Sequence, residues 1–199
     1  MTIGIIGSGN IGSAFARTLA RAGIGATIAN SRGPDSLKDL VLELGPSIKA
    51  GTREEAASAD TVLVSVNWRK LPSALADLPA WGGRIVIDAN NPIEAPLFKP
   101  VDLNGRASSE VFVDLVPGAR VVKAFNHLQA HVLAGDPRAE GGQRVLFYSG
   151  DDPAAKAEVS GLIERVGFFG IDLGPLAVGA RLVQFPGGTL PVHNLVRFG

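Results

Sequence analysis

Short runs of apolar, mostly branched residues recur along the chain, and within each run they are continuous rather than alternating with polar residues. The runs span residues 2–6, 26–30, 61–66, 84–89, 120–125 and 144–149. Strands covered on both faces of a parallel sheet have this pattern, because neither side of such a strand meets water. The pattern therefore predicts six strands of one mainly parallel sheet.

Helical periodicity fills several intervals between these runs. Residues 10–22 place Ile11, Phe15 and Leu19 on one stripe, and residues 152–166 are also amphipathic. Strand–helix alternation of this kind implies right-handed crossovers between parallel strands. The prediction is an α/β fold with a Rossmann-type doubly wound, mainly parallel sheet.

Start signals locate three of the expected helices. Pro34 predicts a helix over residues 34–44, in which Asp35 caps backbone amides. Thr52 begins a capping-box pattern that leads into a short helix, and Asp152 caps another. These signals agree with the positions that the apolar periodicity gives.

Two segments resist the strand–helix pattern. Residues 90–108 carry three prolines, and residues 134–143 are predicted to form a mobile loop. The end of the chain predicts a short helix, a turn and a terminal segment that closes over the sheet. We therefore expect a main domain over residues 1–172 and a short C-terminal segment over residues 173–199.

Composition and charge narrow the class of protein. The chain has 199 residues, 46% of them apolar, and its 19 basic and 19 acidic residues cancel. No broad positive field attracts nucleic acid or anionic lipid, so an anion site has to be local. Cysteine is absent, which fits a reducing compartment, and no apolar run reaches the ~18 residues of a membrane helix. We expect a cytoplasmic protein without membrane or nucleic-acid partners.

A glycine-rich motif connects the first predicted strand to the first predicted helix. It reads Gly7-Ser8-Gly9-Asn10-Ile11-Gly12 and matches G-x-G-x-x-G. Gly7 permits the tight turn, Gly9 lets a pyrophosphate approach the backbone, and Gly12 lets the helix pack against the strand. The helix N-terminus then faces the anion. All six residues are predicted to bind a dinucleotide cofactor.

The second predicted strand ends in Asn30-Ser31-Arg32, where an NAD-binding protein carries an acidic residue for the ribose. A carboxylate at that position accepts from the 2′-hydroxyl but repels a 2′-phosphate. Arg32 offers a planar fork of donors, and Ser31 offers one more. These residues predict NADP(H) as the cofactor; a solvated arginine in a turn is the alternative.

Ligands on doubly wound sheets bind beyond the carboxyl ends of the strands. The candidate residues at those ends combine neutral amides with apolar groups: Val66, Asn67, Trp68, Asn90, Ala124 and Asn126. Amides both donate and accept, which suits a carboxamide or the edge of a heterocycle. Trp68 either forms a wall against a planar ring or is an ordinary core aromatic.

Patterns for several other chemistries are missing. Tyr148, the only tyrosine, has Asp152 instead of lysine four residues later. His127 and His131 share a helical spacing, but no third metal ligand accompanies them. Lys123 lies inside an apolar strand and is interpreted as a structural lysine. The sequence predicts neither a catalytic acid or base nor a metal site.

With these residues in view, the chain resembles the NADP oxidoreductase, coenzyme F-420-dependent family, whose small members pass hydride between NADPH and a 5-deazaflavin. The same module occurs in STEAP-type metalloreductases. The resemblance covers most of the chain and rests on residues 3–23, 30–32, 59–68, 88–92, 121–126 and 174–183.

The resemblance implies roles for particular residues. Residues 31–32 would hold the NADP phosphate, and residues 67–68 would line the nicotinamide half. Residues 124–126 would approach the place where the two rings stack, with residues 186–188 beside it. Two departures fall in the acceptor pocket: Asn126 stands where some deazaflavin-binding relatives carry histidine, and residues 186–188 form a turn instead of continuing a helix.

The expected function is hydride transfer between NADP(H) and a flavin-like or 5-deazaflavin (coenzyme F-420) acceptor. Stacked rings whose reacting carbons lie ~3–3.5 Å apart need little acid–base help. One alternative is an NADPH-dependent reductase of a small carbonyl, an imine or a free flavin. Relatives of that kind append a helical domain of roughly 100 residues, whereas 27 residues follow residue 172. The other alternative is a non-enzymatic NADPH-binding sensor. We also expect a homodimer that buries the C-terminal segment.

Overall fold

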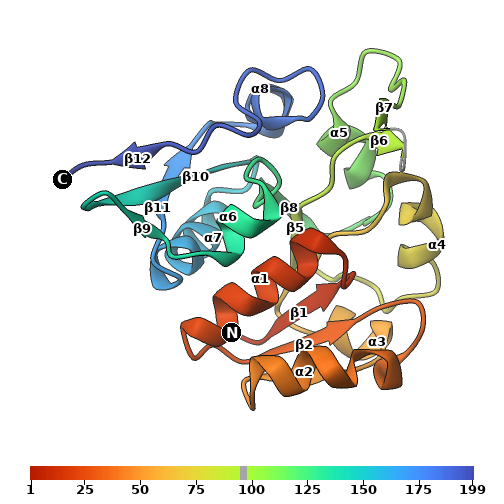
Figure 1. Cartoon of the computed structure of the whole chain (residues 1–199). Helices are drawn as coiled ribbons and strands as arrows, with labels where there is room; N and C mark the ends of the chain where they lie inside the picture. The colour runs from red at the N-terminus through yellow and green to blue at the C-terminus, as the bar shows by residue number, and fades with distance from the viewer. Residues whose placement is uncertain (95–97) are drawn as a thin grey trace.

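The computed structural model describes residues 1–94 and 98–199. The strands are β1 (Ile3–Ile6), β2 (Ala26–Ala29), β3 (Ile48–Ala50), β4 (Thr61–Val64), β5 (Ile85–Asp88), β6 (Ile93–Glu94), β7 (Lys99–Pro100), β8 (Arg120–Ala124), β9 (Arg138–Ala139), β10 (Gly142–Gly150), β11 (Phe169–Asp172) and β12 (Val196–Arg197). The central sheet has the order β11-β10-β8-β5-β4-β1-β2-β3, with β9 and β12 attached to β10 (Figure 1). β6 and β7 pair separately.

Within this sheet, the consecutive strands β8, β5, β4, β1, β2 and β3 pair parallel to one another. From β1 the chain first proceeds through β2 and β3 on one side and then returns to β4 on the other side. Such a reversal creates a crevice at the carboxyl ends of β1 and β4, where doubly wound proteins bind dinucleotides. The predicted fold class is confirmed.

Helices cover both faces of the sheet, as Figure 1 shows. One face carries α1 (Asn10–Arg21), α2 (Lys38–Leu44), α6 (Ala130–Ala134) and α7 (Pro153–Arg165). The other carries α3 (Arg53–Ala57), α4 (Leu71–Leu75), α5 (Ser108–Val113) and α8 (Leu176–Val183). Each face buries its own hydrophobic cluster, which explains why the strands read as continuous apolar runs.

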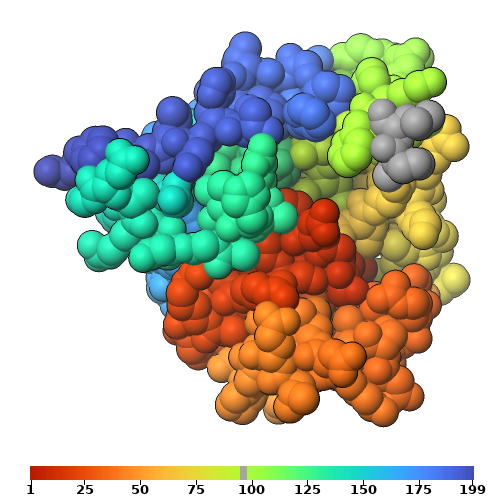
Figure 2. Space-filling model, viewed as in Figure 1, coloured from red at the N-terminus to blue at the C-terminus, as the bar shows by residue number. Residues whose placement is uncertain are grey.

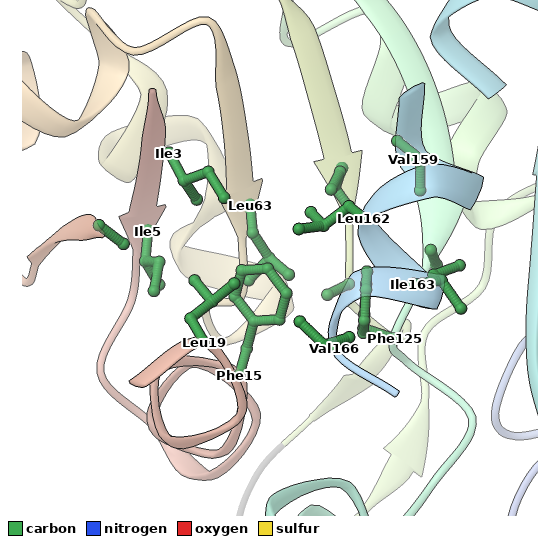
Figure 3. Packing of buried hydrophobic residues seen from close by; sticks show 14 of the residues in the cluster. Ile3, Ile5, Phe15, Leu19, Leu63, Phe125, Val159, Leu162, Ile163 and Val166 are labelled. Atoms are coloured by element: carbon green, nitrogen blue, oxygen red, sulfur yellow. The ribbon is translucent and has the colours of Figure 1, made fainter. Parts of the chain in front are cut away.

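The cluster beneath α1 fixes the start of that helix. Phe15 and Leu19 reach the sheet beside Ile5 and Leu63 (Figure 3), and both are fully buried. The Phe15 and Phe125 rings meet edge to face with their centroids 4.8 Å apart, a favourable aromatic geometry. The packing therefore ties α1 to β1, β4 and the end of β8, the elements that border the crevice.

After β8, one prediction is wrong and one strand pairing differs from the rest of the sheet. Residues 144–149 form a strand as predicted, within the longer β10, which runs antiparallel to β8 and parallel to β11. A continuous apolar run reports burial on both faces but not strand direction. The mobile loop predicted over residues 134–143 instead contains β9, joined to β10 by a two-residue turn in which Glu140 and Gly141 both have positive φ.

Smaller differences concern short elements. The predicted helix over 34–44 begins as a 3-10 turn, η1 (Pro34–Leu37), and Asp35 pairs with Lys38 at 2.8 Å instead of capping backbone amides. β3 and β11 were not predicted. Of the irregular segment 90–108, residues 95–97 lie outside the described residues.

The C-terminal segment contains α8 as expected and then crosses to β10. α8 packs on β10 and β8, and β12 pairs with the start of β10. In Figure 2 this segment, in blue, and the region of β2 and α2, in orange, occupy opposite ends of the visible face. The division at residue 172 stays a prediction.

Candidate functional site

The glycine-rich motif forms the turn between β1 and α1. Gly7 has a φ of 111°, and a Cβ there would lie 2.0 Å from the Ser65 carbonyl oxygen. A Cβ on Gly12 would lie 1.9 Å from the Gly7 oxygen, so α1 packs against the turn only with glycine at this position. A Cβ on Gly9 would meet no described protein atom within 4 Å. The space over Gly9 is therefore open to a ligand.

The N-terminus of α1 borders this open space. Gly9 is the N-cap and offers no capping side chain, and the first turn contains no acidic residue. The first amides of a helix have no partner within the helix and carry the positive end of its dipole. Asn10 and Ile11 provide two of these amides. The turn and the helix start together fit a pyrophosphate.

Asn30 connects the two loops that meet here. Its Nδ2 donates to Ser8 Oγ at 3.0 Å, and its Oδ1 accepts from the Arg32 amide at 2.8 Å. The second bond closes an Asx turn, which fixes the backbone of Ser31 and Arg32. The sequence predicts no role for Asn30. The available signal is that asparagine favours turns, because its side chain accepts from the backbone amide two residues later.

A cavity of about 390 Å³ lies at the carboxyl ends of β1, β2 and β4. The predicted site residues among its lining are Gly7, Ser8, Gly9, Ser31, Arg32, Val66 and Asn67. Arg53 and Lys70 line it as well and were not predicted. Among the described lining residues there are three cations and no carboxylate, so the cavity favours a phosphorylated ligand.

Asn67 and Trp68 have different surroundings despite their adjacency. Asn67 is exposed on the cavity wall, and its Oδ1 accepts from the Arg69 amide at the start of η2 (Trp68–Lys70). The Trp68 side chain is 8% exposed and belongs to the hydrophobic cluster that contains Leu71 and Phe112. Of the two interpretations offered for Trp68, the structure favours the core aromatic.

A buried ion pair lies at the carboxyl ends of β5 and β8. Lys123 Nζ donates to Asp88 Oδ2 at 3.1 Å and to the Asn90 carbonyl oxygen, and neither charged side chain is exposed. Asp88 also accepts from Ser109 Oγ at 2.7 Å. Burial lowers the pKa of Lys123, and the Asp88 carboxylate opposes that shift. Lys123 is therefore a satisfied structural lysine, as expected.

This ion pair determines where Asn90 points. Asp88 Oδ1 accepts from both the amide and the Nδ2 of Asn90, at 3.0 and 2.8 Å. The free oxygen, Asn90 Oδ1, accepts from the Val66 amide at 2.8 Å. Because Val66 lines the cavity, the ion pair supports the cavity wall through Asn90.

Asn126 follows β8, two residues after the fully buried Ala124, and lies outside the cavity described above. Its Nδ2 donates to Asn91 Oδ1 at 3.0 Å and to the Val183 carbonyl at 2.8 Å. Asn91 Oδ1 accepts a further bond from the Phe185 amide. The buried Asn126 Oδ1 has no partner among the described residues. The two amides therefore attach the C-terminal segment to the strand ends.

The histidines are not arranged as metal ligands. His127 is 2% exposed, and neither ring nitrogen has a hydrogen-bond partner among the described residues. Burial lowers the pKa of His127 to about 4; the nearby Val145 backbone opposes this shift, and His193 adds slightly to it. His131 is exposed. Within residues 1–94 and 98–199, no group of three or more potential side-chain ligands gathers around a metal position.

The Rossmann-type fold and the cation-lined cavity fit an NADP-dependent oxidoreductase. Residues 2–92 match the family described as NADP oxidoreductase, coenzyme F420-dependent. A crystal structure of a putative F420-dependent NADP-reductase from Arthrobacter sp. FB24 is 30% identical, with a TM-score of 0.74, and the match covers 88% of this chain and 86% of that one. The chain belongs to this family.

Other relatives extend the comparison. A hypothetical protein, SMa0349, from Sinorhizobium meliloti has a crystal structure that is 47% identical, with a TM-score of 0.94 over 100% of this chain and 97% of that chain. The metalloreductase STEAP3 of Rattus norvegicus is 32% identical over 194 residues, which are 95% of this chain but only 37% of the relative. A reductive aminase from Aspergillus terreus in complex with NADPH shares the fold, with 22% identity and a TM-score of 0.62. That match covers 90% of this chain and 57% of the aminase chain.

No helix within the described ranges, 1–94 and 98–199, combines the length and apolar character needed to cross a membrane.

Proposed function

We propose that the protein transfers a hydride between NADP(H) and a flavin-like acceptor, a 5-deazaflavin of the coenzyme F-420 type. The observation that carries the proposal is the pairing and burial of the titratable groups at the ends of β5 and β8. Asp88 and Lys123 are paired with each other in the interior, and His127 is buried with its neutral form favoured. Reduction of a carbonyl requires a proton donor at the alkoxide, whereas hydride transfer between stacked rings does not.

We assign each group of predicted residues to one part of the cofactor. The motif from Gly7 to Gly12 holds the pyrophosphate, and Ser31 and Arg32 hold the 2′-phosphate. Val66 and Asn67 orient the nicotinamide half, and Asn90 supports Val66 from behind. The backbone of residues 124–126 borders the acceptor together with residues 173–199. The bound dinucleotide supplies the hydride; the side chains bind it, orient it and exclude water.

The decisive experiment measures steady-state oxidation of NADPH with four candidate acceptors: coenzyme F-420, FMN, FAD and a simple carbonyl. Turnover with coenzyme F-420 alone supports the proposal. Turnover with the carbonyl supports a reductase of small carbonyls or imines, and turnover with FMN or FAD supports a free-flavin reductase. Tight NADPH binding without turnover supports an NADPH-binding sensor.

The cofactor assignment has its own test in Arg32→Ala. The change should weaken NADPH binding by about tenfold, the effect of losing one charge-assisted contact, and leave NADH binding nearly unchanged. The loss is partial because Arg53 and Lys70 stay in the cavity. Titration calorimetry with both cofactors measures this, and an equal loss for NADPH and NADH contradicts the assignment of Arg32 to the 2′-phosphate.

We further infer a homodimer that buries the C-terminal segment. Val192, Leu195 and Phe198 are 54%, 45% and 64% exposed there, and apolar side chains gathered on one exposed segment favour association. A cytoplasmic location stays a prediction from the cysteine-free composition.

A further inference from the structure

We infer that Arg53 and Lys70 form a second wall at the adenosine end of the cavity, in which Arg53 stacks on the adenine ring and Lys70 contacts the 2′-phosphate. The inference rests on the proposed assignment of this cavity to NADP(H). Arg53 would then contact a part of the cofactor that NADH and NADPH share, and Lys70 would contact a group that only NADPH carries.

The backbone of Arg53 is fixed because Arg53 is the first residue of α3, directly after a capping box. Thr52 Oγ1 accepts from the Glu55 amide at 3.2 Å, and Glu55 Oε2 accepts from the Thr52 amide at 2.8 Å. Reciprocal bonds of this kind order the start of a helix. The Cα of Arg53 is therefore held at the cavity wall.

The guanidinium group of Arg53 is fixed as well. Its Nη1 donates to the carbonyl oxygens of Ser73 and Ala74, at 2.9 and 3.2 Å. These carbonyls lie in the last turn of α4, where a helix leaves carbonyl oxygens without partners of its own. The side chain is 29% exposed. Arg53 is thus a pre-positioned planar group and not a mobile surface arginine.

The bonds of Arg53 favour an aromatic ligand over a phosphate. Nη1 is committed to two carbonyls, and the Glu54 carboxylate lies 3.6 Å from Nη2, which offsets part of the charge. A guanidinium engaged along its edge keeps its flat face free for stacking. Adenine is the planar ring at this end of the dinucleotide, and NADPH and NADH both carry it.

Lys70 differs from Arg53 in that its properties favour a phosphate. It is exposed, and its ammonium group forms no ion pair within the described residues. A compact ammonium on a flexible stem suits a phosphate oxygen better than a ring face. Its neighbour Arg69 instead pairs with Glu94, with Nε at 3.0 Å from Oε1, and does not line the cavity. Arg69 is therefore a matched control for a cation at this surface.

Calorimetric titration of the full chain with NADPH, NADH and adenosine 2′,5′-bisphosphate tests the division of roles. Arg53→Gln, whose amide still donates to a carbonyl, should weaken all three ligands by a similar factor of about 3–10. Lys70→Ala should weaken NADPH and the bisphosphate by a similar factor and leave NADH unchanged. Arg69→Ala should change none of them.

The outcomes separate this inference from the proposed function. An Arg53→Gln effect confined to the phosphorylated ligands overturns the stacking role, and unchanged NADPH binding in Lys70→Ala overturns the phosphate contact. If Arg32→Ala alone weakens NADPH, the inference fails while the NADP(H) site stands. If the wild-type chain binds none of the three ligands, the proposed function fails first. A ligand-free melting temperature for each variant identifies losses caused by unfolding.

Discussion

At the scale of single residues, the three glycines of the first turn differ in what their missing side chains leave free. Gly7 and Gly12 lie against backbone oxygens of the protein itself, whereas Gly9 lies against open space. The first two are required for folding of the turn. The third is required only if a ligand occupies the space above it.

We therefore expect Gly9→Ala to affect cofactor binding and Gly12→Ala to affect stability. Gly9→Ala should keep the free energy of unfolding within about 1 kcal/mol of wild type, because its methyl group meets no protein atom. It should weaken NADPH binding at least tenfold, since the methyl group blocks the pyrophosphate. Gly12→Ala should lower stability, because its methyl group would overlap the Gly7 oxygen.

Urea denaturation and calorimetry measure the two properties separately. Unchanged NADPH binding in Gly9→Ala would place the pyrophosphate elsewhere.

His127 gives the protein a pH dependence. Its pKa of about 4 in the folded state lies below the unfolded value near 6.5. Between these values the unfolded chain binds more protons, so acidification should lower the free energy of unfolding, by about 3 kcal/mol when pH 4 is reached. His127→Phe should flatten this part of the profile, and His131→Phe, at an exposed position, should not. Denaturation curves at pH 7 and pH 4.5 provide the comparison; an unchanged slope in His127→Phe assigns the acid sensitivity to other groups.

The sequence identifies some residues of the site and not others. Gly7 and Arg32 are identifiable because a motif and its spacing locate them on consecutive strand ends. Arg53 was missed because β3, only three residues long, gives no strand signal, so Arg53 was not placed at the carboxyl edge. Asn90 was predicted, but the support it receives from Asp88 and Lys123 depends on pairing between β5 and β8, which one sequence does not report.

At the scale of elements, the pair between Asp88 on β5 and Lys123 on β8 joins neighbouring strands in the interior. Buried ion pairs add little net stability over apolar residues, but removing one partner leaves the other charge without compensation. The pair holds Asn90 and, through it, the end of β4. Its contribution is therefore the arrangement of three strand ends.

Lys123→Met should destabilise the fold by about 3–5 kcal/mol, since it leaves the Asp88 carboxylate buried alone. The double variant with Asp88→Asn should lose less than the sum of the single changes, because no unpaired charge is left. Lys156→Met, which breaks a partly exposed pair with Asp172, should cost at most about 1 kcal/mol. Equilibrium urea unfolding of the wild type, Lys123→Met, Asp88→Asn and the double variant gives the coupling energy, and strict additivity would refute the coupling.

The elements that the sequence predicts are those with a strong local signal. β1, β2, β4, β5 and β8 are continuous apolar runs, and α1 and α7 are long enough to show their periodicity. The direction of β10 has no local signal, because it is set by pairing with strands distant in the sequence. β9 also lacks one, because a two-residue turn at Glu140 and Gly141 converts a polar segment into an edge strand.

At the scale of the whole molecule, the two halves of the sheet have different surroundings. The half from β3 to β4 carries the cation-lined cavity. The half with β8, β10 and β11 carries the C-terminal segment, whose last residues leave the body beside β10 (Figure 1). A partner surface on that segment would lie away from the adenosine end of the cavity.

The homodimer is tested by sedimentation across micromolar concentrations. The wild-type chain should sediment as a dimer, and Phe198→Ser should shift it toward monomer without changing the melting temperature of the monomer, because Phe198 is 64% exposed. Leu42→Ser, at an 83% exposed residue on α2, is the control and should stay dimeric. A wild-type monomer at every concentration would end the proposal.

The amide of Asn30 has a practical consequence for anyone who wishes to retarget this protein to NADH. One side chain braces the serine of the glycine turn and also sets the backbone that presents Ser31 and Arg32. Under the proposed cofactor assignment, exchange of Arg32 for an acidic residue with Asn30 kept should change selectivity. Replacement of the whole loop should also weaken binding of the diphosphate that both nucleotides share. In that assignment Asn30 supports both the preference for a cofactor and the affinity for it, so a redesign should keep Asn30 and change its neighbours.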